Sequence, residues 1–198
     1  MPTPATDHRR ATAERNVTAI LDATERLARE RRTLSMAAVA AEAGVSRVTL
    51  YAHFARLQDV VEAAVERGVE VATSALDAAN VADGPADVAL GRMIDASWMH
   101  LARQDALARA AVEHVPPQRL HRAHEPLLAR LRELLRRGQD EGVFRTDLPL
   151  EWLAHVIYTL FHAAADHARD RGIAPADAGE MVQTTIRDVV RARPAVSA

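Results

Sequence analysis

An all-α fold is the architecture that this sequence predicts. The chain has 198 residues, of which 48% are apolar and only 4% aromatic, and it contains eight glycines. Ala, the strongest helix former, is abundant, and β-branched residues rarely alternate with polar ones. Apolar residues recur instead at intervals of three and four, the spacing of one helix face. We therefore expect helices throughout, with enough apolar residues for a buried core.

The composition also excludes several classes of protein. The chain has no cysteine, so it has neither disulfides nor thiolate metal sites. No apolar run approaches the ~18–20 residues that span a bilayer, and no signal peptide is present, so we expect a cytoplasmic protein without a membrane partner. His121 and His124 are three residues apart but lack a third ligand by local spacing, so we expect no metal and no cofactor.

The chain begins with a polar lead over residues 1–11, which we expect to be disordered. Such arms reach DNA phosphates or the minor groove, and the alternative is a solvated tail. A long helix follows at about residues 12–31, because one face of that segment is apolar. Its members are Ile20, Ala23, Leu27 and Ala28.

Residues 33–54 predict two short helices joined by a tight turn. Ser35 and Ser46 each precede a short helix, where a hydroxyl can accept a hydrogen bond from an unpaired backbone N–H. Gly44 stands where the first helix must stop, because glycine tolerates the left-handed conformation that ends a helix. The first helix has a narrow apolar face made of Met36, Val39, Ala40 and Ala43. This is the pattern of a helix-turn-helix that reads DNA.

The second short helix has a buried side and an outward side. Leu50 and Phe54 are four residues apart and share the buried side. The residues expected to face outward are Arg47, Val48, Thr49, Tyr51 and His53.

The outward residues suit DNA. Arg47 can donate two hydrogen bonds to a guanine edge, and Val48 and the Thr49 methyl group can contact a thymine methyl. Tyr51 and His53 can donate to phosphates. The alternative is that Tyr51 and His53 only cover the edge of a helical bundle.

At these residues the chain resembles the TetR family of bacterial regulators. The resemblance is carried by residues 37–46 and 49–54 and covers about residues 12–67. Three positions depart from the family. Val48 stands where Gly or Ala is frequent, and Arg56 and Leu57 stand where a small capping residue and a phosphate-binding Lys are usual. Arg56 can take over that phosphate contact from one position earlier. The DNA-binding residues implied are Ser35, Ser46, Arg47, Val48, Thr49, Tyr51, His53 and Arg56.

The charge distribution agrees with this interpretation. The net charge is −2, but residues 1–56 carry nine Arg and six acidic residues, whereas residues 57–198 carry sixteen Arg and twenty-one acidic residues. The basic end is the end with the motif, as binding to phosphates requires.

The rest of the chain predicts further helices, separated by breaks at residues 82–85 and 116–117. We expect them over about residues 57–79, around 90–101, from 117 to about 138, around 152–164 and over about 175–191. Residues 138–149 are a second point of resemblance to the TetR family. The resemblance implies that the last two helices of each subunit form a four-helix homodimer interface. A dimer of this kind reads two half-sites of DNA.

The resemblance also implies a small-molecule effector pocket within residues 57–198. The candidate lining residues are Met93, Trp98, Leu101, His114, His121, Trp152, Tyr158 and His162. Large aromatic side chains and Met suit an apolar ligand, and His can orient it. The alternative is that this stripe is plain core.

The sequence thus indicates a DNA-binding domain over residues 1–56 and a helical ligand-binding and dimerisation domain over residues 57–198. The expected function is a ligand-responsive repressor that binds a palindromic operator as a homodimer. The alternative is a dimeric small-molecule-binding module that does not act through DNA. We expect no enzyme, because the chain has no Gly-rich phosphate loop, no Gly-x-Ser-x-Gly turn and no His-Glu-x-x-His pair.

Overall fold

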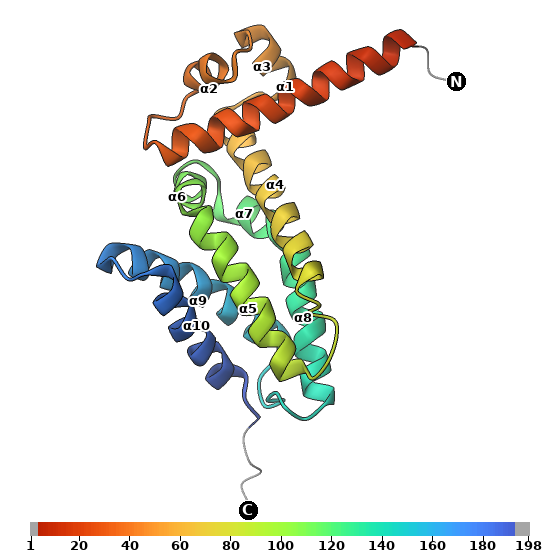
Figure 1. Cartoon of the computed structure of the whole chain (residues 1–198), viewed down its shortest axis with the longest axis vertical. Helices are drawn as coiled ribbons and strands as arrows, with labels where there is room; N and C mark the ends of the chain where they lie inside the picture. Colours follow the sequence, from red (N-terminus) through yellow and green to blue (C-terminus); the bar gives the residue numbers. More distant parts are fainter. Residues whose placement is uncertain (1–3, 193–198) are drawn as a thin grey trace, which may run out of the picture. The chain divides into compact units, whose positions relative to one another are not determined.

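Helices account for all the regular structure in the described part of the chain, which confirms the all-α prediction (Figure 1). The computed structural model describes the backbone of residues 4–192 and the side chains of residues 10–192. No helix in this part is long and apolar enough to cross a membrane. The helices are α1 Pro4–Arg29, α2 Met36–Ala43, α3 Arg47–His53, α4 Leu57–Ala78, α5 Ala86–Arg103, α6 Asp105–His114, α7 Pro117–Ala123, α8 Glu125–Asp140, α9 Leu150–Arg171 and α10 Pro175–Val190.

The chain packs as two compact units. The first unit comprises Met1–Gly68 and Ala106–Ala123, and the second comprises Val69–Asp105 and His124–Ala198. Each unit is therefore built from two separate stretches of chain. This packing division differs from the functional boundary at residue 56, which stays a prediction.

The core of the first unit lies among α1, α2, α3 and the start of α4. Its fully or almost fully buried side chains are Ile20, Leu27, Val39, Ala40, Leu50 and Val60. Thr24 is buried as well, and its hydroxyl donates to the carbonyl oxygen of Ile20 at 2.9 Å. The hydroxyl is thus satisfied within α1, so its burial carries little cost.

α1 begins earlier than expected. It starts at Pro4, so the expectation of a disordered lead is wrong for residues 4–11, while residues 1–3 lie outside the described part. Proline suits the first turn of a helix because its fixed φ is helical and its missing N–H would be unpaired there anyway. No Gly or further Pro follows before residue 12, so nothing interrupts the helix.

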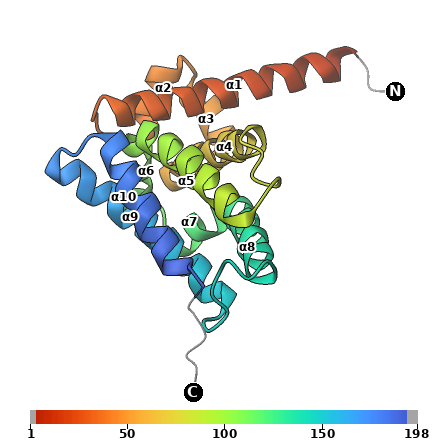
Figure 2. The same cartoon turned by 60° about the horizontal axis from the view of Figure 1, so that its bottom comes forward.

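The second unit packs α5, α8, α9 and α10 around one apolar core. Figures 1 and 2 both show α9 and α10 side by side. The most completely buried large side chains of this core are Leu76, Leu90, Ile94, Leu135, Leu153 and Ile186. A Cβ atom at Gly138 would lie 1.9 Å from the ring of Phe144, so only glycine fits there.

The middle of the chain differs from the sequence-based expectation in two ways. α6 was not predicted, because only three of its side chains are buried and no Gly or Pro marks its start. The single helix expected from residue 117 to about 138 is divided into α7 and α8. Pro126 lies in the first turn of α8 and has no N–H to continue the helix from α7.

Candidate nucleic-acid interface

The turn between α2 and α3 has the caps that the sequence predicts. Ser35 Oγ accepts a hydrogen bond from the backbone N–H of Ala38 at 3.1 Å, and Ser46 Oγ accepts one from Thr49 at 3.0 Å. Gly44 ends α2 with φ +67°, in the left-handed region. These local contacts fix where both short helices begin and where α2 ends.

α3 presents one clearly exposed face. Leu50 is fully buried, whereas Val48 is 80% exposed and Tyr51 is 54% exposed. Arg47 is also exposed, and within residues 10–192 no carboxylate pairs with its guanidinium. The face therefore offers a cation, an apolar group and a phenol hydroxyl to a partner.

Thr49 and His53, which were also expected to face outward, are only half exposed. The Thr49 hydroxyl lies 2.8 Å from Ser46 Oγ, so it takes part in the cap. The His53 ring lies beside the ring of Phe54, with centroids 6.5 Å apart. The exposed face is thus narrower than the sequence alone suggests.

Two nearby arginines, Arg26 on α1 and Arg32 in the turn that follows, are already paired. Glu42 lies between Arg26 and Arg32, at 3.0 and 2.8 Å, and its side chain is 17% exposed. Hydrogen bonds from Arg32 first, and then from Arg26, hold the pKa of Glu42 below its usual range. This carboxylate neutralises part of the charge around α2, so Arg47 is more available to a partner than Arg26 and Arg32 are.

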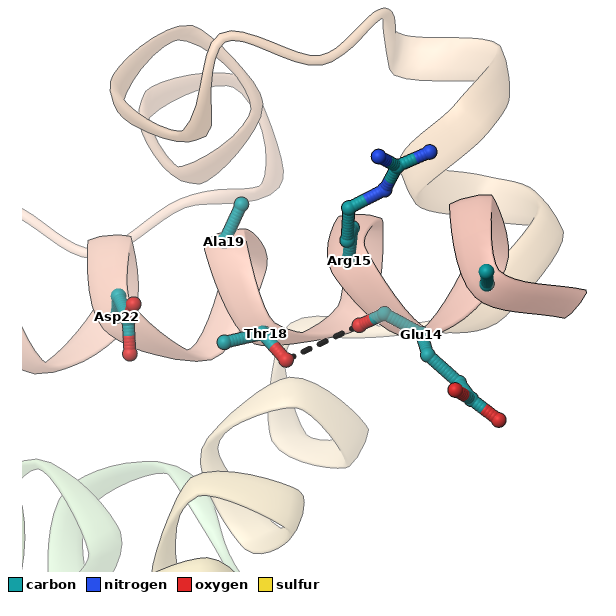
Figure 3. A pocket seen from close by; sticks show the side chains of 6 residues that line it. Glu14, Arg15, Thr18, Ala19 and Asp22 are labelled. Carbon is teal, nitrogen blue, oxygen red and sulfur yellow. Dashed lines mark hydrogen bonds between the residues drawn. The ribbon is translucent and has the colours of Figure 1, made fainter. Parts of the chain in front are cut away.

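A shallow groove of about 500 Å³ follows one stretch of α1. Figure 3 shows Arg15 pointing away from Glu14 and Asp22, and Thr18 donating to the backbone carbonyl oxygen of Glu14 at 3.0 Å. The lining residues are Ala11, Glu14, Arg15, Thr18, Ala19 and Asp22. Because two of them are carboxylates, this groove is a poorer phosphate site than the α3 face.

Arg56 joins α3 to α4. Its guanidinium is 66% exposed and lies 3.4 Å from the Asp59 carboxylate, while its backbone N–H donates to Asp59 Oδ2 at 3.1 Å. Sequence reasoning selected Arg56 but missed Asp59. The i, i+3 spacing of an acid in the first turn of α4 was the available signal.

Two effector candidates belong to the core of the second unit. Met93 is 5% exposed and Trp98 is 4% exposed. The Trp98 Nε1–H donates to the carbonyl oxygen of Pro175 at 2.6 Å, and its ring packs edge-on against Phe161 at 5.9 Å. A Cβ atom at Gly179 would lie 2.8 Å from the indole. The indole is thus enclosed by α9 and α10.

Three rings gather between the start of α8 and the middle of α9. The centroid of His124 lies 5.4 Å from that of Tyr158 and 5.5 Å from that of His162, and Tyr158 and His162 are 4.4 Å apart. His162 Nδ1 lies 2.9 Å from the carbonyl oxygen of Tyr158, so Nδ1 carries a proton. Burial raises the pKa of the Tyr158 phenol. The structure thus brings together two of the effector candidates, Tyr158 and His162, and places His124 beside them.

The remaining candidates are dispersed. Leu101 is half buried in α5, whereas Trp152 is 57% exposed in α9. His114 and His121 belong to α6 and α7 of the first unit. The eight candidates therefore do not all belong to one packed unit.

Two family models match the chain. The model described as bacterial regulatory proteins, tetR family, matches residues 20–64, and the model described as tetracyclin repressor-like, C-terminal domain, matches residues 88–169. Together they cover more than half of the sequence. No curated protein matches the chain as a relative.

Solved structures share the fold at low sequence identity. FadR of Bacillus subtilis, a transcriptional regulator in complex with stearoyl-CoA, has a TM-score of 0.74 and 16% identity, over 85% of this chain and 96% of its own. A TetR family transcription regulator from Marinobacter aquaeolei VT8 has a TM-score of 0.70 and 18% identity, over 93% and 100%. The TetR-like regulator LfrR of Mycobacterium smegmatis, in complex with proflavine, has a TM-score of 0.62 and 22% identity, over 87% of this chain and 94% of its own. At these identities the likeness shows the fold alone.

Proposed function

Because the chain belongs to the TetR family of bacterial regulatory proteins, we propose that it is a repressor that binds a palindromic operator as a homodimer. The observation that carries the proposal is the exposed face of α3, where Arg47, Val48 and Tyr51 stand beside the buried Leu50. A helix with a fixed buried side and a cationic, partly aromatic outward side suits the major groove. The protein acts in the cytoplasm, where its DNA lies.

The residues of this face have different tasks. Arg47 reads a guanine edge, and Val48 and the methyl group of Thr49 contact thymine. Tyr51 and His53 donate to phosphates and set the register of the helix. Ser35 and Ser46 stand at the capped starts of α2 and α3, and Arg56 supplies a further phosphate contact.

The proposed dimer forms through α9 and α10. Trp152 is 57% exposed and Met181 is 56% exposed, although both lie in helices that otherwise bury apolar side chains. Large apolar groups left in water favour a partner surface, and a second copy also supplies the second recognition helix. Sedimentation of the Trp152→Asp variant tests this: a monomer is expected, and an unchanged dimer would place the interface elsewhere.

A small-molecule effector is proposed to release the operator. Support comes from the two structural relatives that were crystallised with stearoyl-CoA and with proflavine. Within the second unit, Tyr158 and His162 are the best candidates to contact it, because their rings are half exposed and adjacent. The other proposed contacts within this unit are Met93, Trp98, Leu101 and Trp152.

The first test is binding of the purified protein to DNA from around its own gene, compared with scrambled DNA at two salt concentrations. Specific binding that survives moderate salt is expected, because base contacts persist when phosphate contacts are screened. Tyr51→Phe is expected to weaken binding about equally on all sequences. Weak, equal and salt-sensitive binding to both DNAs would instead favour a small-molecule-binding module that does not act through DNA.

A further inference from the structure

An ionic cluster connects α7 to the start of α4 within the first unit. The Arg119 guanidinium of α7 donates to Asp59 Oδ1 from two nitrogens, both at 3.1 Å, and it also pairs with Glu62 one turn further along α4. Asp59 also accepts hydrogen bonds from the backbone N–H of Arg56 at Oδ2 and from the Arg56 guanidinium at both carboxylate oxygens. One carboxylate therefore serves two arginines that are far apart in sequence.

Gln58 completes this cluster. With its amide oxygen turned toward the arginines, it accepts from Arg56 at 2.9 Å and from Arg119 at 2.7 Å. The two guanidiniums are thus held near each other by two shared acceptors. They repel each other, and Asp59 and Glu62 balance them.

The two arginines are held with different strength. Arg119 is 30% exposed and contacts two carboxylates, of which Asp59 is 21% exposed and Glu62 is 12% exposed. Arg56 is 66% exposed, and its guanidinium contacts to Asp59 are long, at 3.4 Å. Arg119 therefore makes the shorter guanidinium contacts to Asp59, whereas the Arg56 guanidinium, which Gln58 also holds, is the more open to solvent.

The ionisation state of Asp59 is consistent with its contacts to two arginines. Partial burial opposes its ionisation, but hydrogen bonds from Arg56 and Arg119 together keep the pKa of Asp59 below its usual range. The carboxylate stays charged at neutral pH. Among the residues that the structure describes, a charged Asp59 that lost Arg119 would keep only Arg56 as a cationic partner.

We propose that Arg119 is a positioning residue for DNA binding: by occupying Asp59, it leaves the Arg56 guanidinium available to a phosphate of the DNA backbone. The inference rests on the proposed function and assigns a role in DNA binding to residues 106–123, which no sequence motif marks. Without Arg119, a phosphate must compete with Asp59 for Arg56, and the protein loses one charge-assisted contact per subunit.

The test uses full-length protein, a random-sequence duplex of about 30 base pairs at low salt, and any operator fragment found. Arg119→Gln is expected to weaken binding several-fold on all sequences and to reduce the salt slope by about one per subunit. Arg56→Gln alone should weaken DNA binding. Added to Arg119→Gln, it should reduce the affinity for DNA little further. Arg119→Lys keeps a cation beside Asp59 and should bind nearly as the parent chain does.

Two further substitutions, each added to Arg119→Gln, distinguish a positioning role of Arg119 from an effect on folding or on net charge. Asp59→Asn keeps an oxygen that can accept from the backbone N–H of Arg56 but removes the competing charge, so Arg119→Gln with Asp59→Asn should recover binding. Glu62→Gln changes the net charge by the same amount as Asp59→Asn does. It also removes the carboxylate that Arg119→Gln deprives of its partner, but it leaves Asp59 charged. Arg119→Gln with Glu62→Gln should therefore remain weak.

Arg132 provides the matched control in the second unit. It also pairs with two carboxylates, Glu125 at 2.7 Å and Glu151 at 2.8 Å, so Arg132→Gln removes an equivalent arginine and should leave DNA binding unchanged. The inference is overturned if Arg119→Gln binds random DNA like the parent chain, or if Glu62→Gln restores binding as well as Asp59→Asn does. If the parent chain binds no DNA at all, the proposed function fails with it.

Discussion

Two aromatic side chains at helical spacing, Tyr51 in the first unit and Trp98 in the second, have opposite surroundings. Tyr51 is 54% exposed on α3, whereas Trp98 is 4% exposed among α5, α9 and α10. The exposure of Tyr51 follows from caps and a buried Leu50 within a few residues of it. The burial of Trp98 depends on Phe161, Pro175 and Gly179, which are distant in sequence. Local contacts can be read from sequence, and distant ones cannot.

The largest expected effect is on the free energy of unfolding, when the rings of Trp98 and Tyr51 are each truncated to Ala. Trp98→Ala should destabilise the protein by about 3–5 kcal/mol, because it leaves a cavity and removes the partner of the Pro175 carbonyl oxygen. Tyr51→Ala is the matched exposed control and should change the free energy of unfolding by less than about 0.5 kcal/mol. Urea unfolding measures both. A Trp98 cost as small as that of Tyr51 would show that the indole is not part of the core.

An intermediate effect is expected at Arg47, on the exposed side of the comparison. Arg47→Ala should cost about 1–3 kcal/mol of operator binding and relax specificity at one base pair, because a bidentate contact to guanine is lost. Binding to operators with single base-pair changes locates that position. Equal losses on every sequence would contradict a base-reading role and reduce Arg47 to a phosphate contact. Protein stability should not change.

The smallest effect is expected at Tyr158, whose surroundings lie between those of Tyr51 and Trp98. Burial raises the folded-state pKa of its phenol above the ordinary value of 10.0. The stability that this group contributes is therefore fully present below pH 10 and is lost as the pH rises through the folded-state pKa. Urea unfolding across this alkaline range should show a weaker pH dependence for Tyr158→Phe than for the parent chain. Identical slopes would contradict the burial of the phenol.

Much of the fold could be predicted from local signals. Ser35, Gly44 and Ser46 act through contacts within three or four residues, so the short helices were placed correctly. Pro175 likewise marks the start of α10. The start of α1 was missed because Pro4 suits both the first turn of a helix and a polar lead, and α6 was missed because no Gly or Pro marks its start.

The site was predictable to a smaller extent. The pattern selected the exposed Arg47, Val48 and Tyr51 but could not show that the Thr49 hydroxyl belongs to the cap. It also could not find Arg119, since pairing with Asp59 joins residues sixty positions apart. Side chains whose roles depend on such distant contacts require the folded structure.

The divided first unit has a consequence for making hybrid regulators. A chimaera that joins residues 1–56 of this chain to the remainder of another regulator would recombine α4, α6 and α7 from a foreign parent. The α3 surface would be inherited intact, yet Arg56 would face an unrelated acid and an unrelated counterpart of Arg119. Transplanting residues 57–68 and 106–123 with the recognition helices is the crossover scheme that keeps inherited partners together.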